Sequence, residues 1–200
     1  MLILGLNAYH GDSSACILKD GKLVAAVEEE RFRRIKHWAG FPAEAIRWCL
    51  KETKSSLADV DHVAINSDPK AQFLQKLNFM IKRRPDLELI LDRVQNRRER
   101  RCIAQELEEA IPGSFSGKTH QVEHHLAHLA SAHWASTFKE SVAISVDGFG
   151  DFCSLSIAKC NNEKIEIIEK VFFPDSLGLF YEAFTQFIGF KNYGDEYKMM

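Results

Sequence analysis

Four of the eight histidines in this chain fall within the twelve residues VEHHLAHLASAH, at 122–133. The spacing of apolar residues predicts a helix over about 124–138, preceded by a short strand. His124 and His128 are four residues apart, so a helix places both on one face, within reach of a common ion. Such an HxxxH pair is a frequent half of a metal site, but two ligands do not complete one.

The third ligand must come from another element, and Asp147 is the best candidate. It ends the predicted strand VAISVDG, and a carboxylate at a strand's C-terminal end points into the cleft of an α/β fold. Two imidazoles and a carboxylate suit Fe(II), Zn or Mn. The alternative is that His124 and His128 are surface or capping residues. Of the other two histidines, we expect His125 to support the ligands or touch a substrate, and His133 to be structural.

His10 is a second candidate for chemistry, because it lies in the loop NAYHGDSSA between two apolar runs. A histidine flanked by glycine, aspartate and serines is suited to bind an anion or to act as a general base. The alternative is a turn residue whose side chain caps the loop. Backbone N–H groups of such loops also hold phosphate. We expect that role for Gly11, Asp12 and Ser13 here, and for Gly148 and Gly150 in SVDGFGD.

Composition bounds the class of protein. The chain has 200 residues, 46% hydrophobic and 27% charged, with a net charge of −2. These values are ordinary for a globular protein with a sizeable core. Its five cysteines form no CxxC pair and no signal peptide precedes them, which favours free thiols and a cytoplasmic location. The apolar runs are too short to cross a membrane.

Two stretches share one order of elements. The first has strands at 2–8, 14–18 and 23–30, a helix at 42–52 and a strand at 60–67; the second has three strands within 141–173 and a helix at about 178–190. Asp-Gly in KDGK predicts the hairpin between the second and third strands. We interpret the pattern as a weak β-β-β-α repeat. It predicts the duplicated, actin-like (ribonuclease-H-like) α/β fold.

This interpretation divides the chain into a first subdomain at 1–140 and the start of a second at 141–200. The second is incomplete, because no strand follows its helix before the chain stops at YGDEYKMM. We therefore expect a truncated chain or a fragment.

Between the two units lies a predicted helical insertion at about 70–118, broken by Pro85. Eight lysines and arginines fall between 82 and 101, so a patch for nucleic acid or another anion is one interpretation. Acidic residues interleave with the basic ones, so we favour a solvated helical insertion without nucleic acid.

Several motifs, in order along the chain, resemble the N-terminal part of the O-carbamoyltransferases of the nodulation-factor and cephamycin type. They are ILGLNAYHGDSSACILKDGKLVAAVEEERFRRIKH with a following FP, then HHLAHLASA, SVDGFGD, and LGLFYEAFT with the later GF and GDEYKMM. The resemblance spans nearly the whole chain and is weakest in 70–118. It implies the actin-like fold already predicted from the pattern.

The resemblance implies a biosynthetic transferase. A C-terminal domain, absent here, would make carbamoyl adenylate from carbamoyl phosphate and ATP. The N-terminal domain would move the carbamoyl group to a hydroxyl of a sugar-like or antibiotic-like small-molecule acceptor. His124, His128 and Asp147 match the family's ligands for a metal, Fe(II), with a further aspartate expected beyond Met200. His10 matches the loop histidine that contacts the carbamoyl or nucleotide moiety.

Two other functions stay open at this point. A sugar kinase or ATPase of the same fold would need carboxylates and Mg²⁺ rather than imidazoles. A truncated remnant without catalysis would act as a binding module. Whether the chain is a fragment or a remnant, we expect it to be inactive in isolation.

Overall fold

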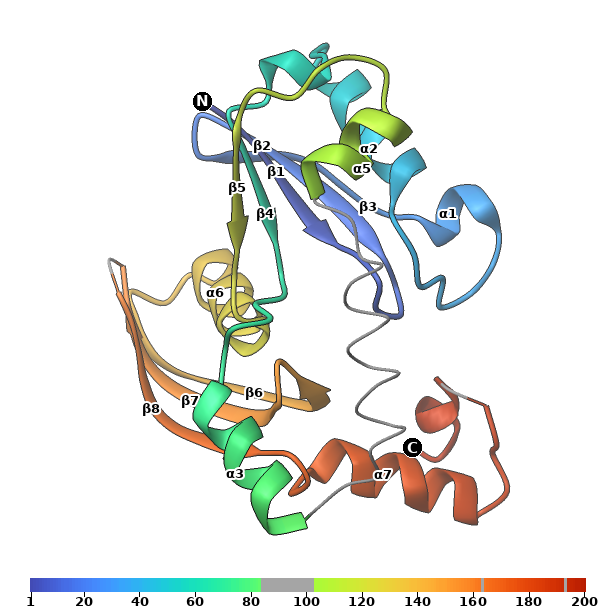
Figure 1. The fold of residues 1–200 in the computed structure, drawn as a ribbon, viewed down its shortest axis with the longest axis vertical. Coiled ribbons are helices and arrows are strands. Elements are labelled where there is room, and N and C mark those ends of the chain that lie inside the picture. Colours follow the sequence, from blue (N-terminus) through green and yellow to red (C-terminus); the bar gives the residue numbers. More distant parts are fainter. Residues whose placement is uncertain (84–102, 163, 193) are drawn as a thin grey trace. The chain divides into compact units, whose positions relative to one another are not determined.

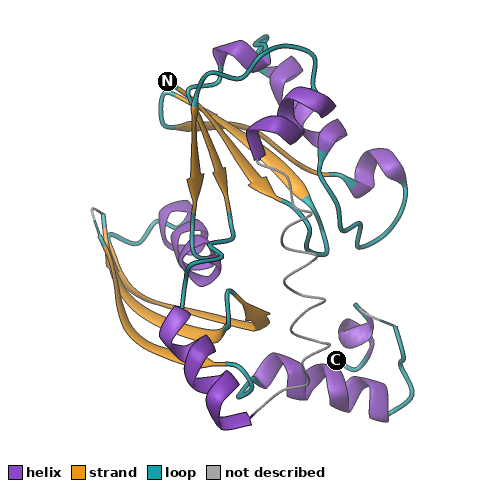
Figure 2. Cartoon of the chain, in the orientation of Figure 1, coloured by secondary structure: helices purple, strands orange, loops and turns teal. Residues whose placement is uncertain are grey.

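The computed structural model of the chain describes residues 1–83, 103–162, 164–192 and 194–200. These residues form a mixed α/β structure with two sheets (Figures 1 and 2). They cluster into two compact units, the first containing 1–66 and 103–121, the second containing 67–83 and the described residues of 122–200. Each unit is described by itself.

The first unit is built on a five-stranded sheet in the order β3-β2-β1-β4-β5. The strands are β1 (Leu2–Asn7), β2 (Ser14–Lys19), β3 (Lys22–Glu28), β4 (His62–Ile65) and β5 (Lys118–Gln121). The first three pair antiparallel as hairpins, whereas β4 pairs parallel with β1 and β5 pairs parallel with β4.

The turn between β2 and β3 follows the Asp-Gly signal. Asp20 and Gly21 both have positive φ, 52° and 77°, as a two-residue hairpin turn requires at both central positions. Leu2, Leu4 and Leu6 alternate with half-buried residues along β1. This period of two gives β1 one buried face.

Helices α2 (Ala43–Glu52) and α5 (Ile103–Ala110) supply the rest of this core. Ile46 and Leu107 are fully buried in one cluster with the leucines of β1. The short α1 (Glu30–Arg33) and the 3₁₀ turn η1 (Leu57–Asp59) lie in the connections. The carboxylate of Glu29, which is fully buried, accepts the backbone N–H groups of Glu44 and Ala45 and so caps α2.

A second pair of histidines lies in the first unit. His62 on β4 and His120 on β5 have Nδ1 and Nε2 3.0 Å apart in an exposed contact. This pair offers a natural comparison for the histidines of the HxxxH segment.

The second unit is built on an antiparallel sheet of β6 (Glu140–Gly150), β7 (Cys153–Asn161) and β8 (Ile165–Phe172). Helix α6 (His124–Ala135) packs on β6 and β7, and α7 (Leu177–Phe187) packs on β6. The short turn η2 (Asp195–Lys198) follows α7. Leu129 of α6 is buried against Ala158 and Cys160 of β7.

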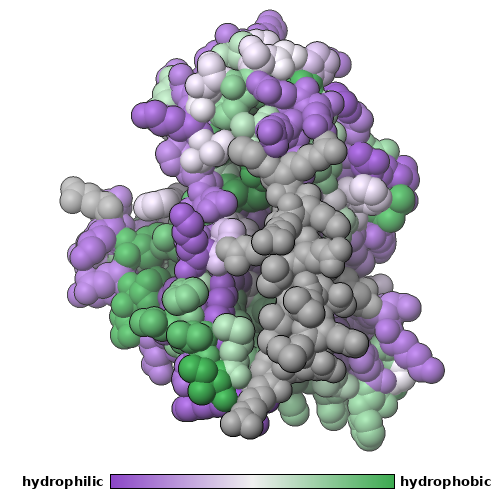
Figure 3. Space-filling model, viewed as in Figure 1, coloured by the Kyte–Doolittle hydropathy of each residue, from purple (hydrophilic) through white to green (hydrophobic). Residues whose placement is uncertain are grey.

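Helix α3 (Phe73–Arg83) completes the second unit. The ring of Phe79 packs edge-on against Phe152 and Phe173, whose centroids are 5.5 and 5.4 Å away. Other apolar side chains of α3, including Phe73 and Leu74, are exposed, and hydrophobic residues gather over this helix in Figure 3.

The predicted elements are found with small shifts in their ends, and the mixed α/β class is confirmed. Helix α6 clusters with 141–200 in the second unit. The predicted insertion at 70–118 lies partly outside the described residues, as do six of the eight basic residues between 82 and 101. Its described helices belong to different units, α3 to the second and α5 to the first. In the described part of the chain, no helix has the length and apolar character needed to span a membrane.

Candidate metal centre

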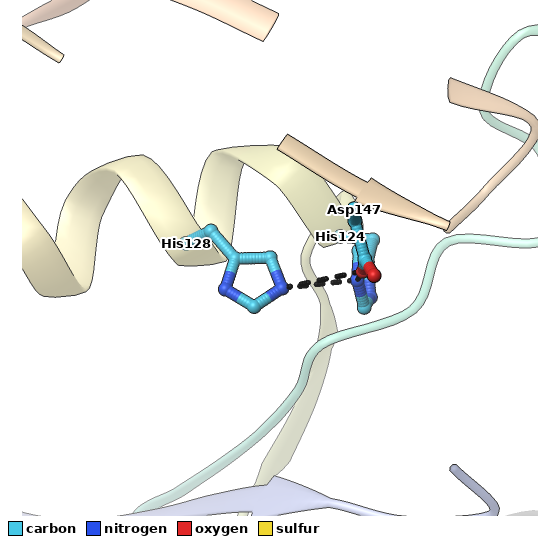
Figure 4. A group of neighbouring side chains, drawn as sticks. All are labelled: His124, His128 and Asp147. Carbon is cyan, nitrogen blue, oxygen red and sulfur yellow. Dashed lines mark hydrogen bonds and ion pairs between the residues drawn. The ribbon is translucent and has the colours of Figure 1, made fainter. Parts of the chain in front are cut away.

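Three side chains of the second unit converge on one point (Figure 4). His124 Nε2 lies 2.8 Å from Asp147 Oδ2 and 3.0 Å from His128 Nε2. His128 Nε2 lies 3.8 Å from the same carboxylate oxygen. Among the described residues this is the one group of three or more potential metal ligands. The structure thus brings together the three residues expected from the sequence.

The spacing of these three atoms fits a transition metal. Ligands bonded at about 2.1 Å in tetrahedral or octahedral geometry lie roughly 3 to 3.4 Å from one another. The three observed distances, from 2.8 to 3.8 Å, bracket that range. Two imidazoles and one carboxylate are also a donor set typical of transition-metal sites, whereas Mg²⁺ and Ca²⁺ prefer oxygen ligands alone.

The charge of the centre suits a cation. Hydrogen bonds from His124 and then His128 hold the pKa of Asp147 far below its usual range, so Asp147 is a carboxylate. His124 is buried, whereas the side chain of His128 is 51% exposed and that of Asp147 is 41% exposed. One side of the centre therefore faces solvent, which leaves space for water or a substrate group.

Asp147 is positioned by the start of α7. The hydroxyl of Ser176, the N-cap of that helix, donates to the carbonyls of Asp147 and Gly148 at 3.2 and 2.6 Å. A Cβ on Gly178 would lie 2.5 Å from the Asp147 carbonyl. Glycine at this position lets the first turn of α7 approach the end of β6 closely.

His125 and His133 face the sheet and fasten α6 to it. His125 is fully buried, with Nδ1 2.8 Å from the Ser145 hydroxyl and Nε2 2.9 Å from the Cys153 carbonyl. The carbonyl requires a proton on Nε2, and burial lowers the pKa of His125, so the ring is neutral. The substrate contact that we considered for His125 is wrong, because burial closes this ring to a substrate.

His133, eight residues after His125 on the same helix, makes the same kind of contacts. Its Nδ1 lies 2.8 Å from the Ser141 hydroxyl and its Nε2 lies 3.0 Å from the Asn161 carbonyl. Its structural role, expected from the sequence, follows from these bonds.

The loop of His10 belongs to the first unit, where it joins β1 to β2. Asn7 Nδ2 donates to the carbonyls of Gly11 and Asp12, and Ser13 Oγ donates to the carbonyl of His10. The segment after α1 also fixes it, since Asp12 Oδ1 lies 2.9 Å from His37 Nδ1. The loop is therefore a defined turn on its own sheet.

Sequence reasoning missed Asp151, which lies beside the centre. Its carboxylate accepts hydrogen bonds from the backbone N–H groups of His124 and Asp68 and from the Ser67 hydroxyl. The available signal was the second aspartate of VDGFGD, four residues after Asp147. Glu123, the N-cap of α6, was missed as well; its Oε2 accepts the N–H of Leu126.

The chain is similar over its whole length to several known proteins. It is 36% identical to the uncharacterized protein sll1178 of Synechocystis over 99% of this chain and 34% of that protein. It is 33% identical to nodulation protein NolNO of Sinorhizobium fredii, over 97% of this chain and 28% of the relative. It is 30% identical to the uncharacterized protein MJ1051 of Methanocaldococcus jannaschii, over 100% of this chain and 32% of that one. The chain thus spans about a third of the length of the curated relatives it matches.

Among solved structures, YeaZ from Pseudomonas aeruginosa aligns with a TM-score of 0.46 and 12% identity, over 87% of this chain and 68% of that one. At this level the alignment does not establish a shared fold. A family model described as Carbamoyltransferase N-terminus matches residues 2–200. By that match, and by the relatives above, this chain belongs to the carbamoyltransferase N-terminus family.

Proposed function

We propose that this chain is the N-terminal part of an O-carbamoyltransferase. It moves a carbamoyl group from carbamoyl adenylate to a hydroxyl of a sugar-like or antibiotic-like acceptor. The observation that carries the proposal is the convergence of His124, His128 and Asp147 in a chain that the family model matches almost completely. A kinase or ATPase is disfavoured, because phosphoryl transfer relies on Mg²⁺ held by oxygen ligands.

The three residues would hold a divalent metal, and we propose Fe(II). Bound there, such an ion supplies Lewis-acid stabilisation of negative charge that develops during acyl transfer. Asp147 contributes a carboxylate that is already ionised. The exposed side of His128 leaves the centre open to the reacting groups.

The loop residues are proposed to bind and activate the substrates. The imidazole of His10 would take the proton of the acceptor hydroxyl or hold the carbamoyl group. Backbone N–H groups of Gly11 and Asp12 would hold the phosphate of the adenylate. The N–H groups of Ser13 and Gly148 already donate to the Trp38 carbonyl and to the Asp147 carboxylate.

The whole enzyme is proposed to be larger than this chain. In the duplicated actin-like fold that we propose, 1–140 would form the first subdomain and 141–200 the start of the second. Relatives about three times as long support a further region. It would make carbamoyl adenylate from carbamoyl phosphate and ATP. We propose a cytoplasmic location, no membrane or nucleic-acid partner, and a small-molecule acceptor.

The test uses the whole enzyme of which this chain is proposed to be the N-terminal part. It is incubated with ATP, carbamoyl phosphate labelled in the carbamoyl group, and a panel of sugars and aminoglycosides. We expect label to enter an acceptor while AMP is released. Phosphate transferred from ATP to the sugar, with no carbamoyl label, would support the kinase interpretation instead.

In the same assay, His10→Ala should reduce transfer by about 10²–10⁴-fold, the usual effect of losing a general base. Metal content should not change. If His10 only caps its turn, the variant would lose about 1 kcal/mol of stability and keep its rate per folded molecule. Transfer rate and melting temperature measured together separate the two roles.

A further inference from the structure

The end of β6 and the start of α6 are joined through one carboxylate. Asp151 Oδ2 lies 2.9 Å from the backbone nitrogen of His124 and 2.8 Å from that of Asp68. Its Oδ1 lies 3.2 Å from the hydroxyl of Ser67. Three segments that are far apart in the sequence therefore meet at Asp151, all within the second unit.

Gly150, the residue before Asp151, lies directly against the ring of His124. A Cβ built on Gly150 would come within 2.1 Å of His124 Cγ and Cδ2 and within 2.7 Å of Nε2. A Cβ atom essentially never comes within 3 Å of another heavy atom in this way, so any other residue here would displace the imidazole. Gly150 is buried, and its strand is paired with β7 at this point, so the backbone has little room to retreat.

These two contacts fix different parts of one residue. Asp151 holds the backbone of His124, and Gly150 leaves the space that its ring occupies. A ligand nitrogen must be placed to within about 0.5 Å for good metal binding. Because His124 is the first residue of α6, it lacks the preceding helical turn that would otherwise hold its N–H group.

We propose that Gly150 and Asp151 form a positioning element that orients His124 for metal binding, with Asp151 as a positioning residue and not a ligand. This inference rests on the proposed metal centre. Both carboxylate oxygens of Asp151 are engaged by protein donors, so its hydrogen bonds point it to the backbone rather than to the ion. Glu123 assists from the other side, since it accepts the N–H of Leu126 in the same first turn.

The experiment measures the affinity of the metal-free chain for Co²⁺, by absorption, in four variants. Asp151→Ala and Gly150→Ala should each weaken binding by about 10–100-fold, the usual effect of losing a group that orients a ligand. Asp151→Asn should stay within about fivefold of wild type, because its amide oxygen can still accept both N–H groups and only the charge is lost.

Asp59→Ala is the matched control. Its carboxylate also accepts a backbone N–H and a hydroxyl, both from Ser56, but in the first unit. This variant should lower the melting temperature and leave the Co²⁺ affinity unchanged.

Hydrogen exchange of the His124 amide in metal-free protein gives a readout that needs no metal. It should be faster in Asp151→Ala than in wild type or Asp151→Asn. Unchanged Co²⁺ affinity in both folded Gly150→Ala and folded Asp151→Ala would overturn the inference. If Asp151→Ala does not fold, the affinity of Gly150→Ala decides. If wild type binds no Co²⁺ while the amide result holds, the metal centre is wrong and the hydrogen bond from His124 to Asp151 stands.

Discussion

The histidines of α6 divide by helix face, and each face has its own chemistry. His124 and His128 share a face that meets Asp147 at the end of β6. His125 and His133 share the face that packs on the sheet, and each bridges a serine hydroxyl to a carbonyl. The enrichment in imidazole therefore reflects two roles, the proposed metal ligation by one pair and the attachment of the helix to the sheet by the other.

Replacing His125 by alanine should lower the stability of the fold and leave the proposed metal centre unchanged. His125→Ala removes a fully buried ring. The Ser145 hydroxyl and the Cys153 carbonyl then lose their hydrogen bonds to the imidazole. We expect a loss of about 2–4 kcal/mol in the free energy of unfolding, measured with urea. Metal bound per folded molecule should stay at the wild-type value. Loss of metal from folded His125→Ala would show that this ring takes part in the centre.

At the scale of elements, helix α2 depends on a carboxylate outside its own sequence. Glu29 is fully buried, accepts the N–H groups of Glu44 and Ala45, and forms an ion pair with Arg33 at 2.7 Å. These N–H groups belong to the first turn, which has no partners inside the helix.

Glu29→Ala should lower the free energy of unfolding by about 3 kcal/mol, because buried donors lose their acceptor and Arg33 loses its partner. The control is Glu28→Ala, next in sequence, whose side chain is 44% exposed and pairs with Arg31. It should change stability by no more than about 0.5 kcal/mol. Equal effects of the two substitutions in urea unfolding would refute the capping role.

The packing of α2 on β2 predicts a pH dependence. Burial raises the pKa of the Cys49 thiol from 9.0 to about 12. As the pH rises, the thiol of Cys49 therefore loses its proton in the unfolded chain before it does in the folded chain. The contribution of the protonated thiol to the stability of the fold is present below pH 9.0 and is lost between pH 9.0 and about 12. For one such group the free energy of unfolding falls by up to about 1.4 kcal/mol per pH unit.

Urea unfolding of wild type and Cys49→Ala across the alkaline range checks this. The difference in stability between the two proteins should shift with pH in favour of the variant. A constant difference would mean that the thiol titrates alike in the folded and unfolded chain.

At the scale of the whole molecule, the sequence predicts those features that depend on the spacing of residues within one segment. An i,i+4 histidine pair and an aspartate at a strand end sufficed to predict that these three side chains converge. The Asp-Gly turn sufficed for the β2–β3 hairpin. Glu28, Glu29 and Glu30 are identical in type, and only the fold makes Glu29 the buried one.

The role of Asp151 in the site likewise could not be predicted from spacing within one segment. Its contacts with Ser67 and Asp68 join residues 84 and 83 positions apart. The parallel pairing of β4 with β1 is likewise set by packing between distant segments. Such contacts depend on the register of whole elements, which spacing within one segment does not determine.

The central claim is that His124, His128 and Asp147 form a metal centre, and metal content per chain tests it most directly. The 200-residue chain is purified anaerobically, loaded with Fe(II), desalted and analysed for metal. The comparison includes His124→Ala/His128→Ala and, as the matched control, His62→Ala/His120→Ala, which removes the other contacting histidine pair. We expect wild type and the control to retain iron and the His124→Ala/His128→Ala variant to lose it. Equal iron in all three proteins would contradict the account.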